Sequence, residues 1–277
     1  INPNWNYSDK TLITSIESSV TDRLTDYGYE TGKTGFTFGS AWEQYDDVIF
    51  SPKIRTFYEK LDTNQSATAN LKKQEGEYFD TSFSYFLDLD KRNQKFQTSS
   101  GYRSRFNQSI PLVSEDKAFY NSYEFTTFNQ ISDMVTRFSI QGSAINAIGD
   151  EDVRISKRLY IPSRKLRGFE SGKIGPKDSG DYVGGNYAAA VNASTTVPYL
   201  FQTLETIDMK MFLDTANVWG VDYSDTVDDS NKIRSSFGIA VDWYTVIGPL
   251  SFSLSQPITK ANTDKTEKFR FQLGTTF

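Results

Sequence analysis

The sequence predicts an all-β fold, an antiparallel transmembrane β-barrel, and two observations carry this prediction. Apolar and polar residues alternate with a period of two in one segment after another, and no long helical face interrupts them. The connections between these segments alternate between tight turns and long loops, which is typical of outer-membrane barrels. The whole chain, residues 1–277, is therefore interpreted as one transmembrane β-barrel domain.

The alternating segments follow one another along the chain, and most span about ten residues. Their centres lie near residues 15, 38, 55, 83, 105, 123, 140, 191, 211, 239, 254 and 272, which predicts about twelve strands. In the fourth segment, residues 79–89, Phe79 and Phe83 share one face, whereas Asp80 and Ser82 share the other. The tenth segment repeats the pattern with Phe237 against Ser236. Each strand is expected to give one face to lipid and one to water.

The connections indicate which rim each loop occupies. Tight ones include "NQISD" and "IGP", whereas the long ones comprise residues 62–74, 150–183 and 220–232. Short turns at one rim and long loops at the other are typical of bacterial outer-membrane barrels. The long loops are therefore expected together on the outward, extracellular side.

A soluble β-sandwich or lipocalin-like barrel also shows alternation, so this competing fold must be weighed. The strands are long for a sandwich, and their polar face is charged and rich in serine, as suits a wet interior. Aromatic residues also gather at the strand ends, as expected of interfacial girdles. These residues are Trp42, Tyr45, Tyr102, Trp219, Trp243 and Tyr244. The three features favour the membrane barrel.

Composition excludes several function classes. The 277 residues include no Cys and no His, which removes Cys nucleophiles, His-dependent triads and most transition-metal sites. A net charge of -5 provides no basic surface for nucleic acid. The acidic run at 222–231 is a candidate calcium loop, although such runs are more often solvated. We predict no enzyme activity, no catalytic residue, no metal and no cofactor.

The stretch "KLRGFESGKIGPKDSGDYVGGN", residues 165–186, contains six glycines and no periodic pattern. A loop this long in a compact domain is usually either functional or disordered. It can extend into solvent or fold back into the barrel lumen. In the second case Arg167 would pair with a carboxylate on the inner face, and the candidates are Asp208, Asp214 and Asp242.

Several short segments of the sequence resemble motifs of a known protein family, and they occur in the same order as in that family. "LRGF" at 166–169 resembles the V/I-R-G-F/Y motif of the outer-membrane assembly-protein superfamily, the BamA-type outer-membrane protein assembly factors. The sequences of these blocks are most similar to those of alphaproteobacterial members. The other similar blocks are "DLDKRNQKFQTSSGY" (88–102), "VGGNYAAAVNASTTVP" (183–198), "MFLDTANVW" (211–219), "SSFGIAVDWYTVIGPLSFSLSQPI" (235–258) and the terminal "FRFQLGTTF".

The resemblance implies specific site residues. The lumen-loop motif would be Leu166, Arg167, Gly168 and Phe169, with Asp214 as the carboxylate that anchors the loop. Two positions depart from the family pattern: Ala216 stands where the family has Gly, and Ser194 stands where some members have an acidic residue. The terminal strand, one side of a lateral gate, would comprise Phe269, Phe271, Leu273, Gly274 and Phe277.

The resemblance also implies extent and function. Family barrels have sixteen strands preceded by periplasmic POTRA domains, so we expect this chain to be the C-terminal part of such a barrel, without the POTRA domains and the first strands. The implied function is insertion of β-barrel proteins into the bacterial outer membrane through a lateral seam. The implied partners are unfolded outer-membrane protein clients, BAM lipoproteins, periplasmic chaperones and the lipid bilayer. A related transporter that exports a partner protein and a passive porin-like channel are the alternatives.

Overall fold

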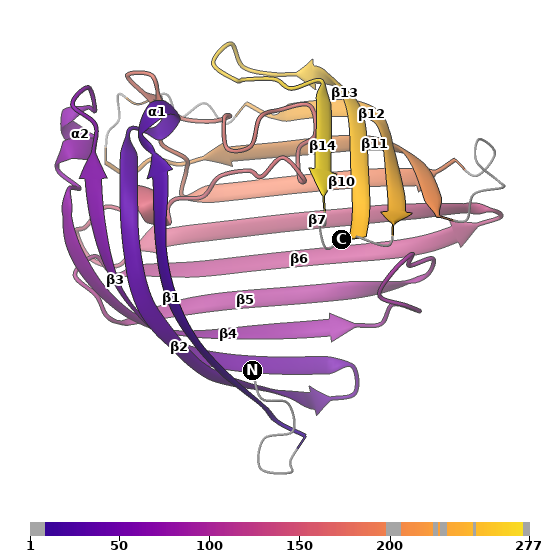
Figure 1. The fold of residues 1–277 in the computed structure, drawn as a ribbon, viewed down its shortest axis with the longest axis horizontal. Coiled ribbons are helices and arrows are strands. Elements are labelled where there is room, and N and C mark those ends of the chain that lie inside the picture. The colour runs from indigo at the N-terminus through magenta and orange to yellow at the C-terminus, as the bar shows by residue number, and fades with distance from the viewer. Residues whose placement is uncertain (1–8, 198–205, 224–226, 228–231, 246–247, 274–277) are drawn as a thin grey trace.

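A computed structural model describes residues 9–197, 206–223, 227, 232–245 and 248–273 (Figure 1). Twelve strands form one antiparallel sheet, in which each strand pairs with the next along the chain. These are β1 (Thr11–Arg23), β2 (Tyr29–Tyr45), β3 (Val48–Thr63), β4 (Gly76–Asp90), β5 (Gly101–Val113), β6 (Ala118–Ile131), β7 (Met134–Ala147), β10 (Tyr187–Thr196), β11 (Ile207–Trp219), β12 (Arg234–Thr245), β13 (Gly248–Thr259) and β14 (Phe269–Leu273). Every predicted strand centre falls inside one of them, which confirms the twelve predicted strands.

The remaining elements lie in the connections. These are α1 (Leu24–Tyr27), α2 (Ala69–Lys72), the 3-10 helix η2 (Ile155–Lys157) and a small hairpin of β8 (Lys177–Asp178) and β9 (Asp181–Tyr182). None of the helices in the described part of the chain is long and apolar enough to cross a membrane. Because successive strands are antiparallel, the three long connections predicted from the sequence leave the sheet at the same rim, the one that carries α1 and α2 (Figure 1).

Two details of the fold differ from the sequence prediction. The ten residues between β4 and β5 lie at the rim of tight turns, whereas only four residues join β5 to β6 at the rim of long loops. Strands β2 and β3 have 17 and 16 residues, more than the predicted ten or so. Their ladder continues through polar pairs such as Glu30 opposite Asp62, which the apolar alternation does not reveal. Backbone hydrogen bonds need no apolar side chain, so these strands extend beyond the segments with apolar alternation.

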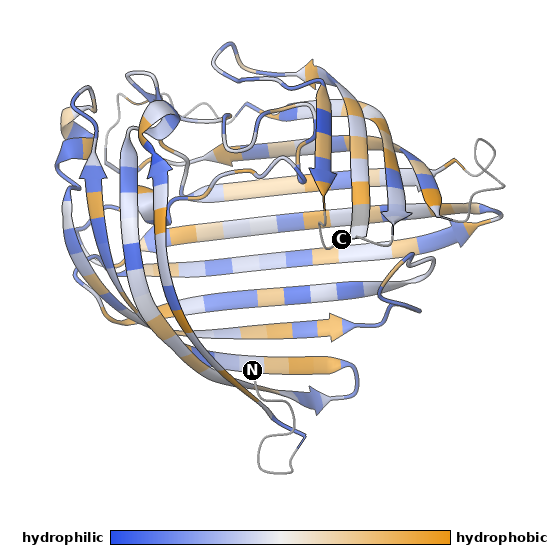
Figure 2. Cartoon of the chain, in the orientation of Figure 1, coloured by the Kyte–Doolittle hydropathy of each residue, from blue (hydrophilic) through white to orange (hydrophobic). Residues whose placement is uncertain are grey.

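Apolar and polar residues alternate along the strands of the curved sheet (Figure 2), and their exposure shows which face each occupies. In β11, Met211 and Leu213 are 55% and 48% exposed, whereas Phe212 and Asp214 are 5% and 0% exposed. In β12, Phe237 is exposed and Ser236 is buried. Met211, Leu213 and Phe237 therefore point outward, as strands that face lipid require, whereas Phe212, Asp214 and Ser236 point into the curve. A sandwich would place the apolar face against a second sheet, and the other sheet of the described residues is only the β8–β9 hairpin.

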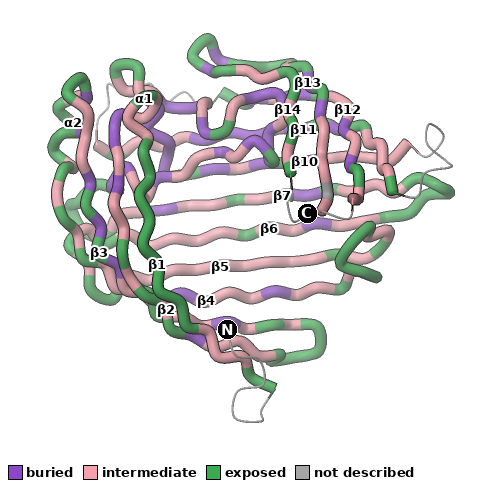
Figure 3. Tube along the Cα trace, in the orientation of Figure 1, coloured by how far each residue is buried: buried purple, intermediate pink, exposed green. Residues whose placement is uncertain are grey.

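The sheet has two edges, β1 and β14, which do not pair with each other in the described residues. Strand β1 is exposed along most of its length (Figure 3). Strand β14 pairs with β13 over five residues, Phe269–Leu273 opposite Leu250–Leu254. The unpaired backbone groups along these edges are free to accept a further strand.

Candidate functional site

The connection between β7 and β10, residues 148–186, is here called the motif loop because it contains the Arg-Gly-Phe triplet. It lies inside the curve of the sheet, close to the rim that carries α1 and α2 (Figure 1). It contacts the inner surface from β3, where the Arg154 side chain meets Glu59, around to β12, where the Arg167 carbonyl accepts from Ser236. The loop therefore crosses the interior and does not extend into solvent.

The structure brings Arg167 and Asp214 together. The Arg167 Nε and Nη2 atoms donate to the two carboxylate oxygens of Asp214 at 2.7 and 2.8 Å, and the Arg167 backbone N–H donates to the same carboxylate at 3.1 Å. The guanidinium also lies over the ring of Phe212, 3.4 Å from its centroid. Such a two-pronged arginine–carboxylate pair combines charge with fixed geometry. It pins the loop to β11.

Asn192 completes the surroundings of Asp214, and sequence reasoning missed it. This residue lies directly opposite Asp214 in the β10–β11 ladder. Its amide Nδ2 donates to Asp214 Oδ1 at 2.9 Å and to the Lys165 carbonyl at 2.8 Å. The Ser236 hydroxyl donates to the carbonyl of Arg167 from the other side. Alternation could have indicated it, because Asn192 shares the inner face with Ser194, where some family members have an acidic residue.

Gly168 and Phe169 fit the wall closely. Gly168 has φ +90°, and a Cβ there would lie 3.1 Å from the Ser255 Cβ and 3.2 Å from the Ser236 Cβ. Only glycine combines this backbone conformation with so close an approach. Phe169 is buried in an apolar cluster between the loop and the wall. The cluster comprises Ile161, Leu166, Phe169 and Ile174 of the loop with Ala188, Ala190, Ala216 and Val218 of β10 and β11.

The other sequence candidates lie apart from Arg167. Asp242 accepts from Lys210 Nζ at 2.7 Å and from the Ser251 hydroxyl, and Asp208 accepts from the Tyr244 hydroxyl. Ala216 sits in the β11 ladder opposite Ala190 and is not among the residues with positive φ. Replacing the family glycine there needs no unusual backbone conformation.

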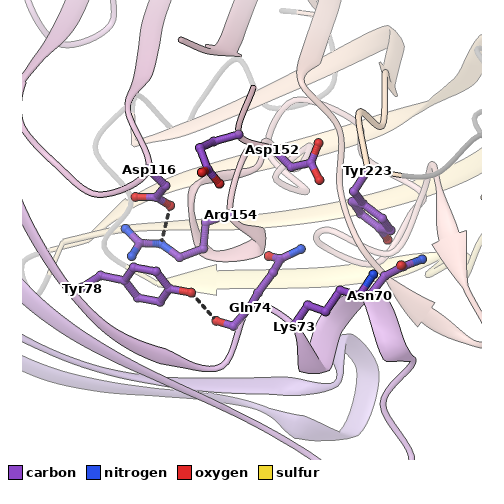
Figure 4. A pocket seen from close by; sticks show the side chains of 9 residues that line it. Asn70, Lys73, Gln74, Tyr78, Asp116, Asp152, Arg154 and Tyr223 are labelled. Atoms are coloured by element: carbon purple, nitrogen blue, oxygen red, sulfur yellow. Dashed lines mark hydrogen bonds and ion pairs between the residues drawn. The ribbon is translucent and has the colours of Figure 1, made fainter. Parts of the chain in front are cut away.

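A second anchor holds the first part of the motif loop (Figure 4). The side chain of Arg154 is 2% exposed and pairs with Glu59 at 3.3 Å, with Asp116 at 3.2 Å and with Asp80. Its guanidinium lies 3.9 Å from the centroid of the Tyr78 ring. These partners come from β3, β4 and the β5–β6 connection, so one arginine joins the loop to three segments. The cavity beside Arg154 has a volume of about 230 Å³.

Further charged pairs tie the loop to both sides of the interior. Lys165 pairs with Glu124 of β6, and Arg158 pairs with Asp222. Asp222 also accepts from Asn186 Nδ2 at 2.9 Å, so the first residue of the acidic run at 222–231 is engaged by the loop. Most of that run lies outside the described residues, and the described part contains no group of three or more potential ligands for a metal ion. Sequence reasoning did not find these pairs.

The terminal strand is described as far as Leu273. Phe269, Phe271 and Leu273 are exposed and alternate with Arg270 and Gln272, so the three apolar side chains point outward like those of the other strands. Gly274 and Phe277, the other two residues predicted for this strand, lie outside the described residues. The described residues leave one edge of β14 without a neighbour.

The chain resembles known outer-membrane assembly proteins. The outer membrane protein assembly factor BamA of Neisseria meningitidis serogroup B is 33% identical over 221 residues, which cover 68% of this chain and 28% of that protein. BamA of Neorickettsia risticii is 25% identical over 256 residues, which cover 90% of this chain and 34% of that protein. The chain thus spans about a third of the length of these relatives.

The fold is shared with a solved structure. BamA from Haemophilus ducreyi lacking POTRA domains 1–3 matches with a TM-score of 0.86 at 20% identity, covering 98% of this chain and 59% of that chain. This likeness confirms the predicted fold class. The model of the Omp85 superfamily domain matches residues 1–277, from the first residue to the last. The chain therefore belongs to the Omp85 superfamily.

Proposed function

We propose that this chain forms part of the barrel wall of an outer-membrane protein assembly factor in the bacterial outer membrane, and that unfolded β-barrel proteins are its clients. The observation that carries the proposal is the motif loop, which the Arg167–Asp214 pair holds inside the curve of the sheet, and β14 lies at one edge of that sheet. An unpaired edge offers a row of backbone N–H and C=O groups to an incoming strand. The BamA relatives, which are named as assembly factors, support the same function.

The proposed mechanism is β-augmentation at this edge, with no chemical step. A client strand adds to β14 through backbone hydrogen bonds, which suits clients of many sequences because every residue except proline supplies both groups. The apolar face of β14, with Phe269 and Phe271 outward, continues into the apolar face of the client. Thinning of the bilayer beside the seam would lower the cost of entry. BAM lipoproteins and periplasmic chaperones are the proposed partners that deliver clients.

The motif loop supports an assembly role over a passive channel. A porin needs an open interior, whereas here the loop crosses it and is held by Arg154 and Arg167. A loop pinned at both places occupies the space that a diffusing solute would use. Single-channel recording distinguishes the two functions, because a steady, large conductance would favour a porin.

Site-specific crosslinking tests the proposal directly. A photo-crosslinking residue at Gln272 on β14 should capture an unfolded client during assembly in liposomes, whereas one at Ser109 in the middle of β5 should not. Residue 109 is the matched control because β5 pairs with strands on both sides and offers no edge. Equal capture at both positions, or none at residue 272 while assembly proceeds, would contradict the proposal.

A further inference from the structure

A second two-pronged arginine–carboxylate pair lies beside the motif loop, in the connection that leads into the terminal strand. Arg234, the first residue of β12, donates from Nε and Nη2 to the two oxygens of Asp264 at 3.0 and 3.1 Å. Both side chains are fully buried, with exposures of 1% and 0%. Arg234 Nη1 also donates to Asn217 on β11 at 2.6 Å, and Asp264 accepts from the Ala261 N–H. The pair therefore fixes the first half of the connection to the wall.

The connection comprises residues 260–268, and its second half pairs with the motif loop through backbone hydrogen bonds. The Glu267 N–H donates to the Gly168 carbonyl and the Glu170 N–H donates to the Lys265 carbonyl, both at 3.0 Å. Phe169 and Thr266 form an isolated antiparallel bridge between them. Strand β14 begins at Phe269, two residues after Glu267. The position of its first residue is thus defined by contacts that precede the strand.

The β13–β14 ladder is described over Phe269–Leu273 opposite Leu250–Leu254, and its first pair follows directly on these contacts. A shift of one residue in a strand moves every side chain to the opposite face. The residue at which β14 enters the ladder therefore sets the face that each of its side chains occupies.

We infer that Arg234 and Asp264 are positioning residues for the terminal strand: the buried pair holds the β13–β14 connection against the motif loop and so sets where β14 begins and in which register it pairs. Loss of the pair frees the connection, and β14 then separates from β13 while the rest of the wall stays paired. The inference concerns strand placement and does not depend on which proteins the chain assembles.

Hydrogen–deuterium exchange of the full-length protein in lipid bilayers tests this inference. In Asp264→Asn, which keeps the shape and removes the charge, amides of residues 265–273 should exchange at least about tenfold faster, whereas those of β4–β6 should not change. The matched control is Asp90→Asn. Asp90 accepts two hydrogen bonds of 2.7 Å from Arg92 in the β4–β5 connection, so this variant removes a similar pair far from β14. It should leave residues 265–273 unaffected.

Two further variants keep the test decisive. Arg234→Lys retains the charge but loses the planar fork, and should raise exchange of residues 265–273 by a smaller factor even if Asp264→Asn does not fold. The double variant Arg234→Gln with Asp264→Asn should exchange less rapidly than the two single effects combined predict, because the two residues act as one unit. Unchanged exchange of β14 in the folded variants, or equal acceleration in β4–β6, would overturn the inference.

Discussion

The wall beneath the motif loop and the wall formed by β4 to β6 use the same chemistry under different conditions. Both contain a two-pronged arginine–aspartate pair. On β4 and β5, Arg103 pairs with Asp88 across neighbouring strands, and the two side chains are 27% and 10% exposed. On β11, Asp214 receives Arg167 from a distant loop, and the exposures fall to 0% for the aspartate and 19% for the arginine. One pair is part of the wall, whereas the other joins two parts of the chain.

Side-chain size explains where the loop can rest. The inner face of β10 and β11 carries small residues, Ala188, Ala190 and Ala216, and the loop packs its own Leu166 and Phe169 onto them. The inner face of β5 carries the long side chains of Arg103 and Arg105, which pair within the wall. We therefore expect the contribution of such a pair to the free energy of unfolding to depend on how fully the loop buries it.

The largest expected effect comes from breaking the buried pair. Asp214→Asn leaves the Arg167 guanidinium beside a neutral amide in a buried site, which should lower the free energy of unfolding by about 3 to 5 kcal/mol. The control Asp88→Asn breaks the pair with Arg103 and should cost only about 1 kcal/mol, because water reaches both side chains of that pair, whereas the Asp214 carboxylate is fully buried. Urea unfolding in lipid measures both. Equal losses would show that burial by the loop is unimportant.

Removal of Arg154 should have a slightly smaller effect, confined to the first part of the loop. Arg154→Met leaves Glu59, Asp80 and Asp116 with one cation fewer, although Lys157 still contacts two of these carboxylates. We expect a loss of about 3 kcal/mol and earlier proteolytic cleavage of residues 148–160. Arg105→Met, at a half-exposed pair, is the control and should cost about 1 kcal/mol or less. Cleavage unchanged in Arg154→Met would argue against the second anchor.

Substitution of Gly168 tests whether the close approach of the loop to the wall contributes to stability. Gly168→Ala combines positive φ with contacts near 3.1 Å, and should destabilise the protein by about 2 kcal/mol. Gly142→Ala on β7 is the control, because no atom lies within 4 Å of its added Cβ and its φ is not positive. The control should change stability by less than about 1 kcal/mol. Thermal unfolding monitored by electrophoretic mobility compares them, and similar values would refute the tight fit.

The smallest expected effect is a pH dependence at the rim. Hydrogen bonds from Lys173 and Lys265 hold the pKa of the Asp26 carboxyl below its ordinary value of 3.8. Because the folded pKa is the lower one, these ion pairs contribute fully above pH 3.8 and are lost as the pH falls below it. Cleavage of residues 260–268 should therefore increase in acid. Asp26→Asn should abolish this increase, and a variant that retains it would exclude Asp26 as the cause.

Local patterns in the sequence predicted the strands and their faces well. The order Met211, Phe212, Leu213, Asp214 alternates outside and inside as expected, because side chains in a strand point to opposite faces whatever the rest of the chain does. Resemblance to a family indicated Arg167 and Asp214, which the structure brings into contact. Their functional role stays a prediction.

Other partners were not predictable from any local pattern. Arg154 meets Glu59, 95 positions earlier in the numbering, and Arg234 meets Asp264 only because the connection after β13 turns back over the wall. In each pair one partner, Arg154 or Asp264, lies in an irregular connection, and many Arg and Asp residues were equally available. Such contacts depend on the path of irregular loops, and no short-range pattern in the sequence encodes that path.

The amino-acid sequence alone determined the alternation that makes one face apolar and one polar, and thereby the number and order of the strands. Alternation by itself left Asp208, Asp214 and Asp242 as equal candidates for Arg167, and only the tertiary structure shows Asp214 in contact with it. All three satisfy the same alternation. The choice follows from where small inner side chains leave room for the loop and from the depth at which the loop excludes water.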